Sequence, residues 1–209
     1  ESEDEVADLI NFSRTTASFR ALMDGKADLL IVGEPNASVY DEMDAAGFKA
    51  SIDTFATDGL VFVVNADNPV NSLTAQQLQD IYAGKITNWK EVGGNDEPIV
   101  PFQRNKDAGS QALMKKLVMK DVPFMAAPEG HIVDSMMGLM EAVRSYDNSA
   151  GAIGYSVYYY AHDMEMAQGL KLLAVDGVAP SAQSIREESY PFRNAYYVVM
   201  AADTPEDSV

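Results

Sequence analysis

Short apolar runs that alternate with helix-like segments constrain the fold of this chain more than any other feature of its sequence. Each run has the length and composition of a buried strand, and some of them end at glycine or asparagine. The runs are Ala27–Val32, Leu60–Val64, Ile99–Phe102, Gly151–Tyr155, Leu170–Val175 and Ala195–Met200. Such alternation of strands and helices predicts an α/β fold with mostly parallel strands, in which ligands bind at the carboxyl ends of the strands.

The segments between these runs carry helix signals. The clearest is a capping box, in which Thr74 is followed by Gln77 and an apolar face, with Gly84 beyond the last turn. Other helices are expected from Phe12 to Gly25, from Ser110 to Met119, from Asp134 to Tyr146 and in the tyrosine-rich segment through Tyr160. In the helix that starts at Ser110, we expect Leu113, Leu117 and Val118 to point inward.

Length and charge limit what the protein can be. A chain of 209 residues with 47% apolar residues can form one large domain or two lobes of about 100 residues each. It contains 15 Lys and Arg against 32 Asp and Glu, a formal net charge of −17. We expect no nucleic-acid partner, because nucleic-acid phosphates require a basic surface. Small anions are also repelled at long range, so a bound anion has to be held by local donors.

Metal, cofactor and membrane signals are lacking in the sequence. There is no cysteine, and His131 and His162 do not have the spacing of a metal site, so neither a metal nor a cofactor is expected. No apolar run reaches the about 18 residues of a membrane helix. The first residues, ESEDE, have no signal-peptide features, and Thr204–Glu206 reads as a helix start. We therefore expect that any signal peptide has been removed and that the chain is cut at its end.

The stretch PFQRNKDAGSQALM, residues 101–114, is the best candidate for a binding site. A strand is expected to end near Phe102 and a helix to begin near Gly109 or Ser110, where the backbone N–H groups are unpaired and the helix dipole is positive. Arg104 could place two N–H donors on an oxyanion, and Asp107 could orient it. The alternative interpretation is an ordinary capped helix start with Arg104 as a solvated loop charge.

Other candidate residues are individually weaker. Thr15 and Thr16 are either N-caps of the first helix or hydroxyl donors to the same ligand. Glu34 is either a surface carboxylate or an acceptor for a ligand proton. Trp89 is expected to pack rather than to stack on a ligand.

The remaining clusters point to packing rather than to chemistry. We expect the methionines Met136, Met137 and Met140 in the core, and Tyr155 with Tyr158–Tyr160 packed between lobes. No Ser-His-Asp or Cys-His set can be assembled, and the carboxylates are too scattered to nominate an acid–base pair. Enzymatic chemistry is therefore not expected.

Four segments together carry a family resemblance. They are NPVNSLTAQQLQDIYAGKITNWKEVGG, RNKDAGSQ, GAIGYSVYYYA and DGVAPSAQSIREESYPFRNAYYVV, and they extend over most of residues 60–200. In sequence and in order they resemble the phosphate-binding proteins of bacterial ABC phosphate importers.

The resemblance implies a type II periplasmic-binding-protein fold, with two α/β lobes joined by two hinge strands and closing on an oxyanion in the cleft. Residues 1–65 plus 198–209 would form lobe one, and residues 66–197 lobe two. The hinge strands would be Leu60–Asn65 and Ala195–Met200. The family's N-terminal strand with a Gly-Ser-Thr loop, and its C-terminal helices, have no counterpart in the sequence. We therefore expect lobe one to be incomplete. Either the chain is truncated at both ends, or it is a diverged version with a partly open first lobe.

The resemblance also implies roles for individual residues. The family grips its anion with an Arg-x-x-x-Ser-Gly-Thr loop, in which Arg104 matches the arginine, Gly109 the glycine and Ser110 the threonine. Ala108 stands where the family has serine, so one hydroxyl donor is lost.

Two further positions concern the first lobe. Thr15, or Thr16 if the register shifts by one, matches a ligand-binding Ser or Thr. After the strand that matches Ala27–Val32, the family often has a Ser-Asp pair whose aspartate accepts the proton of hydrogen phosphate. This chain has Val32-Gly33 at that place, and Glu34, one position away, could replace the aspartate.

These matches lead to a functional hypothesis with alternatives. The chain is expected to be an extracytoplasmic solute-binding protein, in the periplasm or on the cell surface with or without a lipid anchor. It would capture inorganic phosphate or a related oxyanion for a membrane ABC permease. One alternative is a sensory or adhesive surface module with the same fold and weak or no anion binding. A hydrolase is the third and least favoured.

Overall fold

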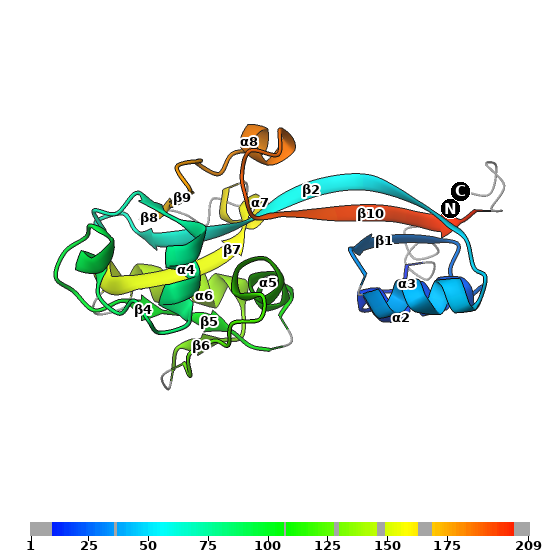
Figure 1. Ribbon diagram of the computed structural model, residues 1–209, viewed down its shortest axis with the longest axis horizontal. Coiled ribbons are helices and arrows are strands. Elements are labelled where there is room, and N and C mark those ends of the chain that lie inside the picture. The colour runs from blue at the N-terminus through cyan, green and yellow to red at the C-terminus, as the bar shows by residue number, and fades with distance from the viewer. Residues whose placement is uncertain are drawn as a thin grey trace, which may run out of the picture. The chain divides into compact units, whose positions relative to one another are not determined.

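The computed structural model describes residues 10–35, 37–106, 108–127, 130–145, 149–162 and 169–202 (Figure 1). The chain forms two compact units. Unit 1 comprises Glu1–Thr57 and Ala195–Val209, and unit 2 comprises Asp58–Asn194. The sequence predicted two functional lobes with boundaries near residues 65 and 198, and this division stays a prediction.

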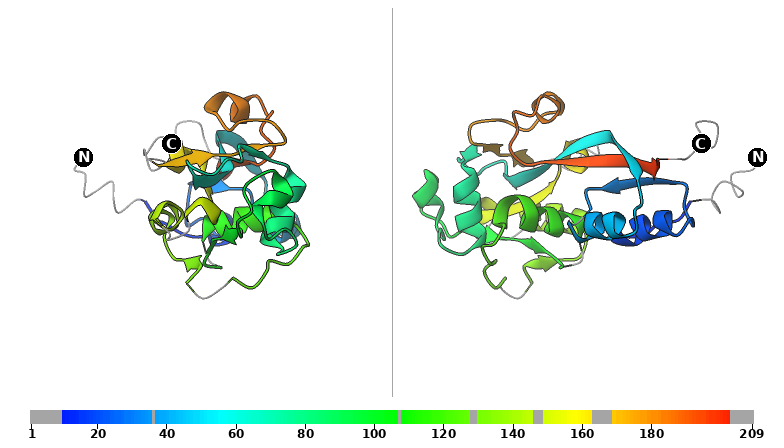
Figure 2. Two further views of the ribbon diagram at one scale, coloured as in Figure 1. Left: turned by 90° about the vertical axis from the view of Figure 1, so that its left-hand side faces the viewer. Right: turned by 45° about the vertical axis from the view of Figure 1, so that its right-hand side comes forward.

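Unit 1 is built on strand β1 (Leu29–Gly33), which pairs antiparallel with β10 (Arg193–Ala201). Helices α2 (Thr15–Met23) and α3 (Ala37–Ala45) lie on one face of β1 (Figure 1; Figure 2, right). Residues of β1 alternate between the two faces, so Leu30 is buried against the helices and Ile31 is 60% exposed. The core of this unit consists of Phe19, Leu22, Leu30, Val32, Val39, Met43 and Val199.

Strand β2 (Ala50–Asn65) is much longer than the run from which it was predicted. Residues 53–57 are exposed, whereas residues 59–65 are buried. An apolar run reveals only the buried half of a strand, which is why the sequence indicated Leu60–Val64 alone. The exposed half contains Thr54 and Phe55, which are residue types that favour strands without forming a continuous apolar run.

The main sheet of unit 2 contradicts the expectation of mostly parallel strands. Strand β2 pairs antiparallel with β7 (Ala152–Val157) and with β8 (Leu170–Leu172). Only β4 (Val100–Pro101) pairs with β7 in parallel. Alternation of strands and helices along the sequence predicts parallel pairing if the strands that are adjacent in the sheet are also consecutive along the chain. Here the long ladder joins β2 to a strand that follows it by almost 90 residues, and the sequence pattern does not specify that direction.

Short elements complete unit 2. Two parallel pairs are formed by β3 (Ser72–Leu73) with β9 (Ala174–Val175) and by β5 (Gln103–Arg104) with β6 (Ile132–Val133). The helices are α4 (Ala75–Tyr82), α5 (Gly109–Leu113), a π-helix (Met114–Met119), α6 (Met136–Ser145), α7 (Tyr158–His162) and α8 (Ala182–Arg186), with 3-10 turns at Trp89–Val92 and Ser149–Gly151.

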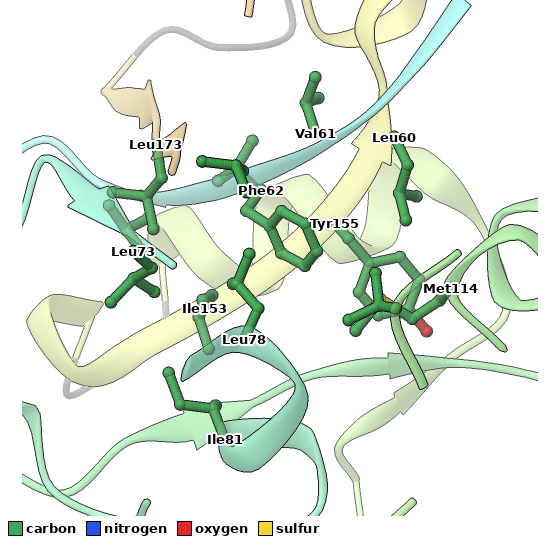
Figure 3. Packing of buried hydrophobic residues seen from close by; sticks show 14 of the residues in the cluster. Leu60, Val61, Phe62, Leu73, Leu78, Ile81, Met114, Ile153, Tyr155 and Leu173 are labelled. Carbon is green, nitrogen blue, oxygen red and sulfur yellow. The ribbon is translucent and has the colours of Figure 1, made fainter. Parts of the chain in front are cut away.

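The predicted capping box of α4 is confirmed. The hydroxyl of Thr74 accepts a hydrogen bond from the backbone N–H of Gln77 at 3.0 Å, and the Gln77 side chain accepts one from the backbone N–H of Thr74 at 2.8 Å. Leu78, Ile81 and Tyr82 are fully buried on one face. They pack with Phe62 of β2 and with Ile153 and Tyr155 of β7 (Figure 3).

Trp89 is a packing residue, as expected. It is 1% exposed, and its indole N–H donates to the carbonyl oxygen of Gly151 at 2.9 Å.

The helix expected from Ser110 to Met119 is divided into α5 and the π-helix. Val118 is buried and Leu113 and Leu117 pack partly buried against the core, as expected. The wider π turn also buries Met114 and Met119 completely, which the sequence pattern did not indicate. The side-chain amide of Gln79 in α4 donates to the carbonyls of Val118 at 2.8 Å and Met119 at 3.2 Å, which satisfies acceptors at the end of the π-helix.

Candidate functional site

Arg104 is the centre of the candidate site in unit 2. It is the second residue of β5, and the parallel register with β6 sets it beside Val133. Its Nε donates to the carbonyl oxygen of Val133 at 3.0 Å, and its Nη2 donates to the carbonyl oxygen of Asp134 at 3.1 Å. These two backbone acceptors fix the plane of the guanidinium group, which is half-buried.

The guanidinium group reaches the first turn of α5. Its Nη1 donates to the hydroxyl oxygen of Ser110 at 3.3 Å and lies 3.5 Å from the sulfur of Met136. Ser110 is only 5% exposed. The structure therefore brings together Arg104 and Ser110, as the resemblance implied. Nη2 carries two N–H groups. Within the described residues only the Asp134 carbonyl accepts from it, which leaves the second N–H able to donate to an anion.

Ala108 and Gly109 form the start of α5. Ala108 is the N-cap residue, with φ −73° and ψ 138°, and its side chain makes no capping hydrogen bond. Gly109 is exposed, and no atom lies within 4 Å of the position that a Cβ would take. The first N–H groups of a helix have no acceptor within the helix, so the backbone here can donate to a ligand that approaches Gly109 closely.

A buried tyrosine, Tyr155, connects β5 and α5 by hydrogen bonds. The sequence analysis did not predict this role. The hydroxyl group of Tyr155 in β7 accepts a hydrogen bond from the backbone N–H of Arg104 at 2.9 Å and donates to Oε1 of Gln111 in α5. Burial raises the pKa of Tyr155 to about 12, although the N–H group and the charge of Arg104 oppose part of this rise. Tyr155 is fully buried within unit 2, so its expected place between lobes was wrong.

Sequence signals for this network were weak. All but the last residue of β7 are buried, so the strand has no polar alternation that could single out Tyr155. Gln111 is a polar residue in a helix start, where capping is the usual explanation.

The other predicted residues belong to unit 1. Thr15 and Thr16 are half-buried and are the first two residues of α2, whose N-cap residue is Arg14, so the N-cap interpretation was wrong. Phe12 precedes the helix and is 92% exposed, which corrects the expected helix start. Glu34 directly follows β1 and is exposed. Burial, and to a lesser extent the Glu34 carboxylate, raise the pKa of Tyr40 in α3.

The remaining expectations have mixed outcomes. Asp107 lies outside the described residues. Among the residues that the structure describes, the backbone carbonyls of Val133 and Asp134 orient Arg104. Among the methionines, Met140 is in the core as expected, whereas Met137 is 59% exposed and Met136 contacts Arg104.

The described part of the chain contains no group of three or more His, Cys, Asp or Glu side chains that could hold a metal ion. Within the same residues, no helix has the length and apolar character needed to cross a membrane.

Comparisons with known proteins give the chain a context. Residues 9–208 match a family described as the PBP superfamily domain. The phosphate-binding protein PstS of Bacillus subtilis is 30% identical over 158 residues, which is 75% of this chain and 49% of that protein. The chain spans about half the length of the curated relatives that it matches.

Solved structures agree with this match. An ABC-type phosphate transport receptor from Vibrio cholerae has a TM-score of 0.72 and 27% sequence identity, over 92% of this chain and 75% of that one. A Clostridium perfringens protein, described as a phosphate ABC transporter substrate-binding protein and solved with bound phosphate, has a TM-score of 0.69 and 27% identity over 92% and 74% of the two chains. These findings confirm the predicted family resemblance and the α/β type II periplasmic-binding-protein fold.

Proposed function

Because the chain belongs to the PBP superfamily domain family, we propose that it is an extracytoplasmic solute-binding protein that captures phosphate or a similar oxyanion for a membrane ABC permease. Its relatives support this proposal, since they are described as phosphate-binding proteins and as receptors of phosphate transport.

The observation that carries the proposal is the placement of Arg104 against Ser110. A guanidinium group whose Nε and Nη2 are held by backbone carbonyls presents its remaining donors in a fixed direction, which lowers the cost of ordering it around an anion. The start of α5 adds backbone donors and the Ser110 hydroxyl from the same side. A chain with a net charge of −17 needs such a local donor set to hold an anion.

The same donor set supports binding rather than conversion of the ligand. Arg104, Ser110 and the helix start supply hydrogen-bond donors to an anion, and none of them needs to exchange a proton to hold it. We further propose that Thr15 or Thr16 adds a hydroxyl donor from unit 1, and that Glu34 accepts the proton of hydrogen phosphate. The role of Thr15 or Thr16 rests on its match to the family pattern, whereas Glu34 lies one position away from the family's aspartate and would replace it.

Titration calorimetry tests the proposal with three ligands: phosphate, sulfate and a small phosphate ester. We expect saturable heat with phosphate at one site per chain, and weaker or absent heat with sulfate, because Glu34 would repel a fully ionised anion. An intact protein that gives no heat with any of the three would contradict the proposal.

A surface module with weak or no anion binding is the second candidate. It is favoured by Ala108, whose methyl group stands where the family has a hydroxyl donor. The same titration separates the two candidates, because this module would remain unoccupied at millimolar phosphate. Turnover of a generic phosphate ester would instead favour a hydrolase.

A further inference from the structure

The backbone N–H of Arg104 is part of a partly buried polar cluster that also contains the hydroxyl of the fully buried Tyr155 and the Gln111 side chain. Tyr155 accepts from this N–H at 2.9 Å, and Oε1 of Gln111 lies 3.3 Å from the same nitrogen. The Tyr155 hydroxyl also donates to Oε1 of Gln111. The three groups therefore connect β5, β7 and α5 through side chains that the proposed site does not use.

The connection matters because Arg104 and Ser110 come from different elements. Arg104 ends the two-residue strand β5, and Ser110 follows it by six residues, in the first turn of α5. Backbone pairing with β6 holds Arg104 but does not hold α5. Gln111 is the residue after Ser110, so its bond to Tyr155 fixes the helix start relative to the strand.

The packing around Tyr155 restricts the movement of the groups in these hydrogen bonds. Tyr155 is 0% exposed and packs edge-on against Tyr82, with ring centroids 5.5 Å apart. Breaking a hydrogen bond in such a site leaves a buried donor or acceptor without a partner, because water cannot easily reach it to take the partner's place. Side chains that lock the geometry of binding residues in this way increase affinity without touching the ligand.

We propose that Tyr155 and Gln111 are positioning residues for the oxyanion site, which set the distance between the Arg104 guanidinium group and the Ser110 hydroxyl. This inference rests on the proposed function. It assigns to both residues a role in ligand affinity beyond their role in stability.

The chain contains a matched control for Tyr155. Tyr190 is also 0% exposed and lies in unit 2, and its hydroxyl donates to the carbonyl oxygen of Leu60 at 2.9 Å rather than bonding to Arg104 or Gln111. Tyr155→Phe and Tyr190→Phe each remove one buried hydroxyl and leave the ring. A purely structural role predicts the same behaviour for both variants.

Calorimetric titration with inorganic phosphate, together with thermal unfolding, tests the inference. We expect Tyr155→Phe to bind phosphate about 10-fold more weakly, since one net hydrogen bond is lost from the support of the site. Tyr190→Phe should bind within about 2-fold of the unmodified protein, although both variants should unfold at a lower temperature. Equal affinities of the two variants would overturn the inference and leave the proposed function intact, whereas an unmodified protein that does not bind phosphate would overturn both.

A second comparison isolates the mechanism. In a Ser110→Ala background, Tyr155→Phe should weaken binding by less than about 3-fold, because the distance that it sets no longer matters. An undiminished 10-fold effect would contradict positioning through Ser110. If Tyr155→Phe does not fold, Gln111→Leu replaces it, with the same expected loss of affinity and the same contradicting outcome.

Discussion

Nη1 of Arg104 lies 3.3 Å from the hydroxyl oxygen of Ser110, and this contact joins the last residue of β5 to the first turn of α5. The pair places a permanent positive charge next to a helix start in a protein with a net charge of −17. The carbonyl acceptors of Val133 and Asp134 belong to the segment that leads into α6. The guanidinium group is therefore held both by this segment and by the first turn of α5.

Ala108→Ser should restore a hydroxyl at the N-cap of α5. The extended backbone of Ala108 suits an N-cap residue, so the serine should accept a hydrogen bond from the helix start and raise the free energy of unfolding by about 0.5–2 kcal/mol. It should also tighten phosphate binding about 3- to 10-fold, because one donor is added. Urea denaturation and calorimetry measure the two effects. Ala112→Ser, at an exposed position within α5, is the control and should give neither gain.

Glu34→Gln should reduce the preference for phosphate over sulfate. Removing the carboxylate takes away the proposed acceptor for the proton of hydrogen phosphate and the repulsion of sulfate. Competition titrations with both anions measure the ratio of the two affinities. Asp41→Asn, an equal change of charge at an exposed position of α3, is the control. A ratio that stays the same in Glu34→Gln and in the control would exclude this role.

Gly154→Ala should destabilise unit 2. A Cβ at this position of β7 would come within 2.5 Å of Cδ2 of Leu139 and 2.9 Å of Cγ2 of Val143, two fully buried residues of α6. Overpacking of this kind costs about 1–3 kcal/mol, which urea denaturation can measure. Gly33→Ala in β1 is the control, since no atom lies within 4 Å of its added Cβ. Equal stability of the two variants would show that α6 does not pack on β7 as described.

Stability should fall in alkaline solution as the buried tyrosines ionise. Burial raises the pKa of Tyr155 to about 12 and also raises the pKa of Tyr82 and Tyr190 above 10.0. Between pH 10 and 12 the unfolded chain releases these protons and the folded chain keeps them, so the free energy of unfolding decreases as the pH rises.

Urea denaturation at pH 8 and at about pH 11.5 measures this effect. The stability difference between the unmodified protein and Tyr155→Phe should be smaller at the higher pH, because the variant has lost one of the groups that ionise. A difference that is the same at both pH values would contradict the raised pKa of Tyr155.

Much of the fold was predictable because its signals are local. The capping box at Thr74 needs only a four-residue pattern, and the buried half of β2 needs only an apolar run. The direction of β7 relative to β2 depends on how distant segments meet, which no local pattern encodes. The π-helix after Leu113 likewise depends on its neighbours, including the Gln79 amide that caps its carbonyls.

The candidate site was predictable in part. Arg104 and Ser110 were nominated from a single stretch of chain, and the structure brings their side chains together. The acceptors that orient Arg104 are backbone carbonyls, which every residue has, so composition gives no signal for them. Tyr155 is distant in sequence and sits in a uniformly buried strand, so its contact with Arg104 required the structure.

The central claim is that Arg104 holds an oxyanion, and phosphate titration of Arg104→Ala tests it most directly. The matched control is Arg186→Ala, which removes an equal charge from an exposed position of α8 in the same unit. We expect Arg104→Ala to lose at least about 100-fold in affinity, because an oxyanion without its charged donor loses several kcal/mol, and Arg186→Ala to bind like the unmodified protein. Unchanged phosphate affinity in Arg104→Ala would contradict the claim and show that the anion binds elsewhere.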